Sequence, residues 1–211
     1  MQPSLFTEPA QQDVHAQTPK SLLDKVPVKI ARQAAAPIIA AIRPVCSKIV
    51  LAGSARRERT HVGDIEFVAI ERHAGAILHE LYQFCYRTKK NPVSFFGKNK
   101  GEKHIQVRVP LTDRELQLEF WITTPKQFGW IHYLRTGPAD WNIATVMQLK
   151  SYGYEIRDGL IIDRANVIDC SEEETVFKLL GIPSMEPKLR CTPLTLARAL
   201  TDAGQQPKFP I

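Results

Sequence analysis

The chain has 211 residues, of which 44% are hydrophobic and 24% are charged, with a formal net charge of +6 and a pI of about 9.2. No apolar run reaches membrane-spanning length and the first residues lack a signal-peptide core, which argues against a membrane or secreted protein. The length suits one ample core or two small lobes, and the basic charge suits a nucleic-acid partner without proving one. Scattered cysteines predict free thiols in a reducing, cytoplasmic setting: Cys46, Cys85, Cys170 and Cys191.

Residues 1–26 are polar and contain three prolines, a composition that predicts a mobile arm. The next segment, Val28 to Ile42, has helical periodicity. Its apolar positions are Ile30, Ala34, Ile38, Ala41 and Ile42. Pro37 interrupts this pattern, so we expect the helix to be kinked or split there.

Buried strands are predicted at Ile49–Ala52 and from Asp64 onward. Because side chains alternate along a strand, Asp64 and Glu66 share one face, and Ile65 points into the core. Two carboxylates about 4 Å apart repel by about 4 kcal/mol at an effective dielectric of about 20. A divalent cation removes this repulsion, and hard oxygen ligands suit Mg²⁺ or Mn²⁺. An ordinary polar strand face is the alternative.

Between these strands, Gly53 and Ser54 mark a turn from which a helix is expected to start. The first N–H groups of a helix are unpaired, and its N-terminus carries partial positive charge. Arg56 and Arg57 are unfavourable for the first turn itself, which is explained if an anion such as a nucleoside triphosphate docks there. A solvated arginine pair beside a tight turn is the alternative.

The motif G-S-x-R-R, followed by G-D-I-E, resembles the signature of the DNA polymerase beta-like nucleotidyltransferases, family X. In that family the Gly-Ser turn binds the triphosphate, and a D-x-D or D-x-E strand binds two metal ions. The resemblance therefore implies nucleotide binding by Gly53, Ser54 and Arg57, with two Mg²⁺ or Mn²⁺ ions at Asp64 and Glu66. Glu66 departs from the Asp that the polymerases usually carry, although Glu is common in other nucleotidyltransferase branches.

The segment 76–86 predicts a helix, after which the chain is basic as far as Arg108. This basic stretch contains Glu102 as its only acid. A DNA-backbone contact and a solvated β-hairpin are about equally good readings of it. In the first reading the residues that bind DNA are Lys98, Lys100, Lys103 and Arg108.

Glu115–Ile122 alternates apolar and polar residues and predicts a strand packed on one side. From spacing alone, we expect Glu119 to be an exposed glutamate on this strand. The resemblance reverses that reading, because the family's third metal-binding carboxylate lies on such a strand, just before a segment like Pro125–Gly129. It implies that Asp64, Glu66 and Glu119 hold one metal ion, which lowers the pKa of the acceptor hydroxyl. Asp64 and Glu66 would also hold a second ion, which binds the triphosphate.

Thr136 and Gly137, followed by Asn142, resemble the family's palm-to-thumb junction. There the Thr-Gly turn packs against the nucleotide sugar, and the Asn contacts the base or the primer minor groove. The resemblance therefore adds these three residues to the nucleotide site. An aromatic pair usually precedes the turn in the larger polymerases, whereas this chain has Leu134 and Arg135.

Two further helices are predicted in the C-terminal part. The first is expected to be capped by Asp140 and to run to about Tyr152. The second is expected near 170–177, with a strong N-cap and an acidic first turn. That helix, its Leu-Leu-Gly-Ile-Pro end and the later Pro187–Arg190 resemble the family's thumb signature. We read the acidic run as a helix start rather than a metal site.

Together these patterns predict an α+β fold. A nucleotidyltransferase palm, a mixed β-sheet with flanking helices, is expected at 27–136, and a small α/β thumb at 137–190. Residues 191–211 form a tail without an assigned structure. The arm at 1–26 leaves no room before the palm for the additional domains of the larger repair polymerases.

The resemblance implies a minimal, monomeric DNA polymerase of a bacterial, phage or viral type, without membrane association. It would add nucleotides from nucleoside triphosphates to the primer 3′-hydroxyl of primer–template or gapped DNA. One alternative is a nucleotidyltransferase of the same fold that acts on RNA, a protein or a small molecule. Another is a catalytically silent nucleic-acid-binding protein.

Overall fold

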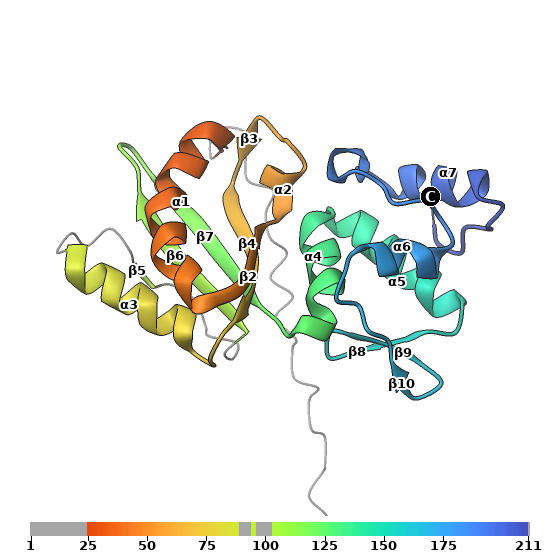
Figure 1. Cartoon of the computed structure of the whole chain (residues 1–211). Helices are drawn as coiled ribbons and strands as arrows, with labels where there is room; N and C mark the ends of the chain where they lie inside the picture. The colour runs from red at the N-terminus through yellow and green to blue at the C-terminus, as the bar shows by residue number, and fades with distance from the viewer. Residues whose placement is uncertain (1–24, 89–93, 96–102, 211) are drawn as a thin grey trace, which may run out of the picture.

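The computed structural model describes residues 25–88, 94–95 and 103–210, which form two lobes with separate hydrophobic cores (Figure 1). The first lobe is built on a mixed β-sheet with helices, and the second is mainly helical. The mixed α+β fold that the sequence predicts is therefore confirmed. Within the described ranges, no helix is both long and apolar enough to cross a membrane.

A five-stranded sheet forms the frame of the first lobe, in the order β2-β4-β7-β6-β5. Its strands are β2 (Cys46–Leu51), β4 (Asp64–Glu71), β7 (Glu115–Ile122), β6 (His104–Pro110) and β5 (Ser94–Phe95). β4 and β7 run parallel, and every other neighbouring pair is antiparallel. The predicted strands at Asp64 and at 115–122 are confirmed, and β2 begins and ends earlier than predicted.

One face of this sheet is apolar and is covered by α1 (Val28–Ile42) and α3 (Ala76–Thr88) (Figure 1). Leu116, Leu118 and Phe120 of β7 are fully buried on this face, as the alternation predicts. α3 buries Ile77 and Leu81 against the same core. The opposite face of the sheet is therefore the one that carries the alternate, polar side chains of β4 and β7.

α1 differs from its prediction in two respects. The helix passes through Pro37 without interruption, so it is not split there. Its buried residues are Ala31, Ala35, Ile38 and Ile42. Ile30, which we predict to face the core, is 47% exposed. The buried stripe is thus rotated toward small alanines, whose short side chains let the helix backbone lie close to its neighbours.

The chain before α1 also contributes to the first lobe. Val26 and Pro27 form strand β1, which pairs antiparallel with β3 (His61–Val62). Val26, which the sequence analysis places in the mobile arm, is 4% exposed and lies in the first core. The rest of the predicted arm, up to residue 24, lies outside the described residues.

The second lobe packs four helices against a small three-stranded sheet of order β10-β9-β8. Its elements are α4 (Phe128–Thr136), α5 (Ala139–Ser151), β8 (Glu155–Arg157), β9 (Leu160–Asp163), β10 (Asn166–Val167), α6 (Glu174–Leu180) and α7 (Pro193–Asp202). α7 comes from the segment 191–211, to which the sequence analysis assigns no structure. Leu196 and Leu200 of this helix are fully buried in the second core.

The predicted N-caps of the two helices are wrong. Pro138 is the N-cap of α5, and Asp140 lies in the first turn without capping the helix. α6 begins at Glu174, and its N-cap residue Glu173 makes no side-chain capping bond. The side chain of Glu173 is used elsewhere, in a buried contact described below.

Gln148 of α5 fastens the C-terminal end of the described chain to the second lobe. This side chain is fully buried. Its amide nitrogen donates to the backbone oxygen of Gln206 (3.0 Å), and its amide oxygen accepts from the backbone N–H of Lys208 (2.7 Å). The neighbouring Phe209 inserts its ring into the second core. Both polar groups of a buried amide are thereby satisfied by the main chain.

α4 connects the two lobes. Phe128, at its start, packs with Ala52 and Val68 of the first lobe, whereas Trp130 and Tyr133 belong to the second core. Figure 1 shows α4 at the border between the lobes. The helix therefore holds the polar face of the sheet against the second lobe.

Candidate functional site

The polar face of the sheet brings together the three carboxylates that the sequence analysis assigns to metal. In the register of parallel β4 and β7, Glu66 lies beside Glu119, and Asp64 lies beside Gln117. Since side chains alternate along each strand, Asp64, Glu66 and Glu119 all point from the same face. Neighbouring β6 places Gln106 beside Glu119 in the same register.

The ionised form of the Glu66 carboxyl is unfavourable at this position. Burial raises the pKa of its carboxyl to about 8, and the nearby carboxylates Asp64 and Glu119 add to this effect. Arg135 and Arg57 act in the opposite direction. A carboxyl with such a pKa is mostly protonated at neutral pH, because the surrounding positive charge does not offset burial and repulsion.

Glu119 is only 9% exposed and is surrounded by hydrogen-bond donors. The Nε2 of His104 lies 3.2 Å from one carboxylate oxygen, and Gln106 donates to the other over 3.0 Å. Gln117 donates to the same carboxylate. Burial acts to raise the pKa of Glu119, but these hydrogen bonds and the charge of His104 outweigh burial, so the pKa is lowered. Glu119 is therefore ionised at neutral pH.

The oxygen ligands on this face are of the type that binds a divalent ion, but the side chains are not positioned to hold one. Among the described residues, no group of three or more His, Cys, Asp or Glu side chains is arranged to hold a metal ion. The oxygen ligands are those that Mg²⁺ prefers, and the raised pKa of Glu66 marks a place where added positive charge would be stabilising. Asp64, Glu66 and Glu119 would hold such an ion once Glu119 releases its protein donors.

Gly53 lies directly against the Glu66 carboxylate. Its backbone has φ +64°, in the left-handed region, and a Cβ atom there would lie 2.1 Å from Oε2 of Glu66. A side chain at this position would both strain the backbone and displace the carboxylate. Glycine is therefore needed for the close approach of the Gly53–Ser54 turn to β4.

The helix that starts at this turn, α2 (Gly53–Arg56), has only four residues. The predicted start is correct, but so short a helix has little aligned dipole with which to attract an anion. The main positive charge next to the turn comes from Arg57 instead. Its guanidinium donates to the backbone oxygen of Thr136, and its Nε atom is buried without a hydrogen-bond partner.

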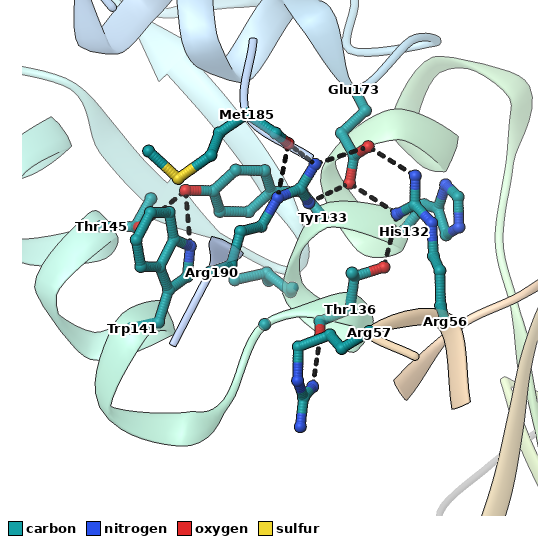
Figure 2. Close-up of polar contacts among 12 residues, drawn as sticks. Arg56, Arg57, His132, Tyr133, Thr136, Trp141, Thr145, Glu173, Met185 and Arg190 are labelled. Carbon is teal, nitrogen blue, oxygen red and sulfur yellow. Dashed lines mark hydrogen bonds and ion pairs between the residues drawn. The ribbon is translucent and has the colours of Figure 1, made fainter. Parts of the chain in front are cut away.

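Arg56 does not face an anion site, contrary to the sequence interpretation. Its guanidinium binds both carboxylate oxygens of Glu173, at 2.9 and 2.8 Å, and donates to the Thr136 hydroxyl at 2.6 Å (Figure 2). Arg190 binds the same carboxylate from the other side, at 2.6 and 3.1 Å. We call this arrangement of Arg56, Glu173 and Arg190 the carboxylate clamp.

The carboxylate clamp is a buried link between the lobes. Arg190 is 1% exposed and Glu173 is 8% exposed. Burial acts to raise the pKa of Glu173, but the hydrogen bonds from Arg56 and Arg190 outweigh it and lower the pKa to about 2. Figure 2 shows Glu173 between the two guanidinium groups, with Thr136 beside Arg56. The clamp thus fixes α2 of the first lobe against α4 and α6 of the second.

Hydrogen bonds from other side chains of the protein hold the Thr136–Gly137 turn in place. Thr136 is completely buried: its hydroxyl accepts from Arg56 and its backbone oxygen accepts from Arg57, so only Gly137 of this turn is partly exposed. Asn142 donates to the backbone oxygens of Leu134 (2.6 Å) and Gly137 (3.3 Å). Its amide oxygen is buried without a hydrogen-bond partner.

The predicted DNA-binding residues are only partly described. Lys98 and Lys100 lie outside the described residues. Lys103 is exposed just before β6. Arg108 projects from β6 beside Gln117 of β7 and forms an ion pair with Glu115 at 3.3 Å. Arg108 therefore belongs to the same face of the sheet as the carboxylates.

Sequence reasoning missed two parts of this site. His104 and Gln106 become neighbours of Glu119 only through the pairing of β6 with β7, which local periodicity does not reveal. Arg135, which the sequence analysis notes as an exception before the Thr-Gly turn, stacks on Trp121, with its guanidinium carbon 3.2 Å from the ring centroid. The sequence signal for Arg135 was an arginine at a position where the family usually has an aromatic residue.

Comparison with models of known protein families and with curated protein sequences finds no match to this chain.

Proposed function

We propose that this chain is a metal-dependent nucleotidyltransferase, and specifically a minimal DNA polymerase of the family X type. The observation that carries the proposal is the pairing of Glu66 with Glu119 across parallel β4 and β7, with Asp64 on the same face. Gly53 and Arg57 border this group from the adjacent turn. A row of carboxylates next to a glycine turn and an arginine suits phosphoryl transfer, because both the metal-binding and the anion-binding groups are present.

In the proposed reaction the 3′-hydroxyl oxygen of a primer bonds to the α-phosphorus of a nucleoside triphosphate. The bond from that phosphorus to the bridging oxygen breaks, pyrophosphate leaves, and the hydroxyl proton passes to solvent. Divalent ions at Asp64, Glu66 and Glu119 would supply charge neutralisation and a lowered pKa for the hydroxyl. The protein's own contribution is to orient the triphosphate through the Gly53–Ser54 turn and Arg57, next to Gly137.

Extension of a gapped DNA primer by the purified chain tests this proposal. We expect extension with Mg²⁺ or Mn²⁺, and none with chelator or in Asp64→Asn. Asp113→Asn is the matched control, because this exposed aspartate lies in the turn between β6 and β7 and pairs with its neighbour Arg114. Equal extension by Asp64→Asn and the wild type would contradict the assignment of the carboxylates.

A catalytically silent nucleic-acid-binding protein is the second candidate. It is favoured by one observation: the Glu119 carboxylate already has His104, Gln106 and Gln117 as partners. DNA binding without extension of DNA or transfer to RNA, under every metal condition, would select this candidate. Transfer to RNA but not to DNA would instead leave the nucleotidyltransferase proposal standing with another acceptor.

A further inference from the structure

Arg135 lies at the edge of the proposed site, and its contacts within the chain leave one of its hydrogen-bond donors without a partner. It lies in the last turn of α4, one residue before the Thr136–Gly137 turn. Its guanidinium carbon lies 3.2 Å from the centroid of the Trp121 ring on β7. Trp121 follows Glu119 on the same face of the strand, so the stacked guanidinium lies at the border of the carboxylate group.

The stack holds the guanidinium in one orientation. His104 also stacks on Trp121, with ring centroids 3.7 Å apart and an interplanar angle of 9°. Two groups this close to one ring centroid must lie on opposite faces of the ring, since they would otherwise overlap. Trp121 is thus fixed between His104 and Arg135. A guanidinium held flat against an indole keeps its N–H donors directed outward along its edge.

The edge of Arg135 has an unused donor. Its Nε atom is buried and has no hydrogen-bond partner, and the same is true of Nε of Arg57. A buried donor on a charged group without an acceptor is costly, so native structures rarely leave one unexplained. Nε–H of an arginine and the N–H beside it form a fork that fits two oxygens of a phosphate. In both arginines the Nε–H donor of this fork has no acceptor within the protein.

The two arginines approach the same place from different elements. Arg57, at the end of α2, donates to the backbone oxygen of Thr136, the residue that follows Arg135. The Glu66 carboxylate acts electrostatically on both guanidinium groups and opposes the effect of their burial. An anion bound between them would contact α2 and α4 together.

We propose that Arg135 is a phosphate-binding residue of this site, which acts with Arg57 on one anionic group of the substrate. Trp121 is its positioning residue. This inference rests on the proposed function, because it takes the substrate to be a nucleotide or a strand end at the carboxylate face. The shared chemistry is a phosphate oxyanion, from the triphosphate or from the acceptor strand.

Calorimetric titration of the full chain with inorganic tripolyphosphate, and separately with a short single-stranded oligonucleotide, tests the inference. Both titrations contain Mg²⁺, because the carboxylates would otherwise repel an anion. Arg135→Leu is expected to weaken at least one of the two probes by at least about tenfold, the change that corresponds to 1.4 kcal/mol. The probe that is weakened identifies the source of the phosphate.

Arg135→Lys keeps the charge but loses the fork and the flat stacking surface. We expect it to bind the same probe at least about threefold more weakly than the wild type, because a bidentate contact becomes a single one. The control is Arg157→Leu, which removes one exposed positive charge on β8. It should stay within about twofold of the wild type, since exposed charges are largely screened.

Trp121→Leu should reproduce part of the loss of affinity seen in Arg135→Leu. Trp121→Phe should bind more tightly than Trp121→Leu, because a phenyl ring can still stack on the guanidinium. A structural role alone would not give this order of affinities at equal thermal stability. Wild-type affinity for both probes in Arg135→Leu, or full rescue by Arg135→Lys, would overturn the inference and leave the proposed function intact. Failure of the wild type itself to bind either probe would overturn the proposed function along with it.

Discussion

Replacement of Glu173 by glutamine should destabilise the protein at neutral pH by about 3 kcal/mol. The carboxylate clamp lowers the pKa of Glu173 to about 2, against a usual value near 4.5. A difference of this size corresponds to about 3 kcal/mol, which agrees with the roughly 3–5 kcal/mol measured when one partner of a buried ion pair is removed. Glutamine retains the shape, but it leaves Arg56 and Arg190 as two uncompensated guanidinium groups.

The stabilisation from Glu173 should depend on pH in a defined direction. Since the folded-state pKa lies below the unfolded value, the stabilisation is complete above about pH 4.5 and is lost as the pH falls toward about 2. Urea unfolding followed by circular dichroism at pH 7 and at pH 3 measures this. The difference between wild type and Glu173→Gln should be large at pH 7 and smaller at pH 3.

The matched control is Glu172→Gln, one residue earlier. Glu172 also pairs with a cation, Lys48, at 3.2 Å, but both side chains are exposed. Such surface pairs contribute only about 0–1 kcal/mol, so this variant should unfold close to the wild type. The reasoning fails if Glu173→Gln loses no more stability than Glu172→Gln at pH 7, or if its loss is the same at both pH values.

Three further outcomes are expected. Gly53→Ala should lose about 1–3 kcal/mol in urea unfolding and reduce any Mg²⁺-dependent activity, because φ +64° strains alanine and its Cβ would displace the Glu66 carboxylate. The stability of the wild type should fall as the pH rises from about 4.5 through about 8, because Glu66 must then ionise in the folded protein. A pH series of thermal melts should show this decline in the wild type and not in Glu66→Gln. DNA affinity should fall steeply with salt and vary little with sequence, and Lys103→Ala should reduce the slope of the salt plot; a flat salt response would instead favour a small-molecule acceptor.

Local pattern was sufficient to predict β4 and β7 and the buried face of β7. The alternation in 115–122 correctly identified which side chains of β7 are buried, because a strand packed on one side has a period of two. The glycine turn was also found, since its sequence neighbours define it. Pairing of β4 with β7 could not be read from the same pattern, because the two strands are joined through α3, β5 and β6.

Burial of charge was the harder problem. Glu173 lies in a run of three acids that is typical of an exposed helix start. Its partners Arg56 and Arg190 come from distant parts of the chain, and only the packing of the two lobes brings them together. The predicted role of Arg56 at an anion site failed for the same reason. A charged residue's environment depends on tertiary contacts that no short motif contains.

The attachment of the last described residues through Gln148 has a consequence for how the second lobe opens. Peeling the segment 205–209 away would leave both polar groups of a buried amide unpaired and would remove Phe209 from the core. The segment 205–209 should therefore not fray. Its amide protons should exchange with solvent together with those of α5 and α7, as one cooperative unit.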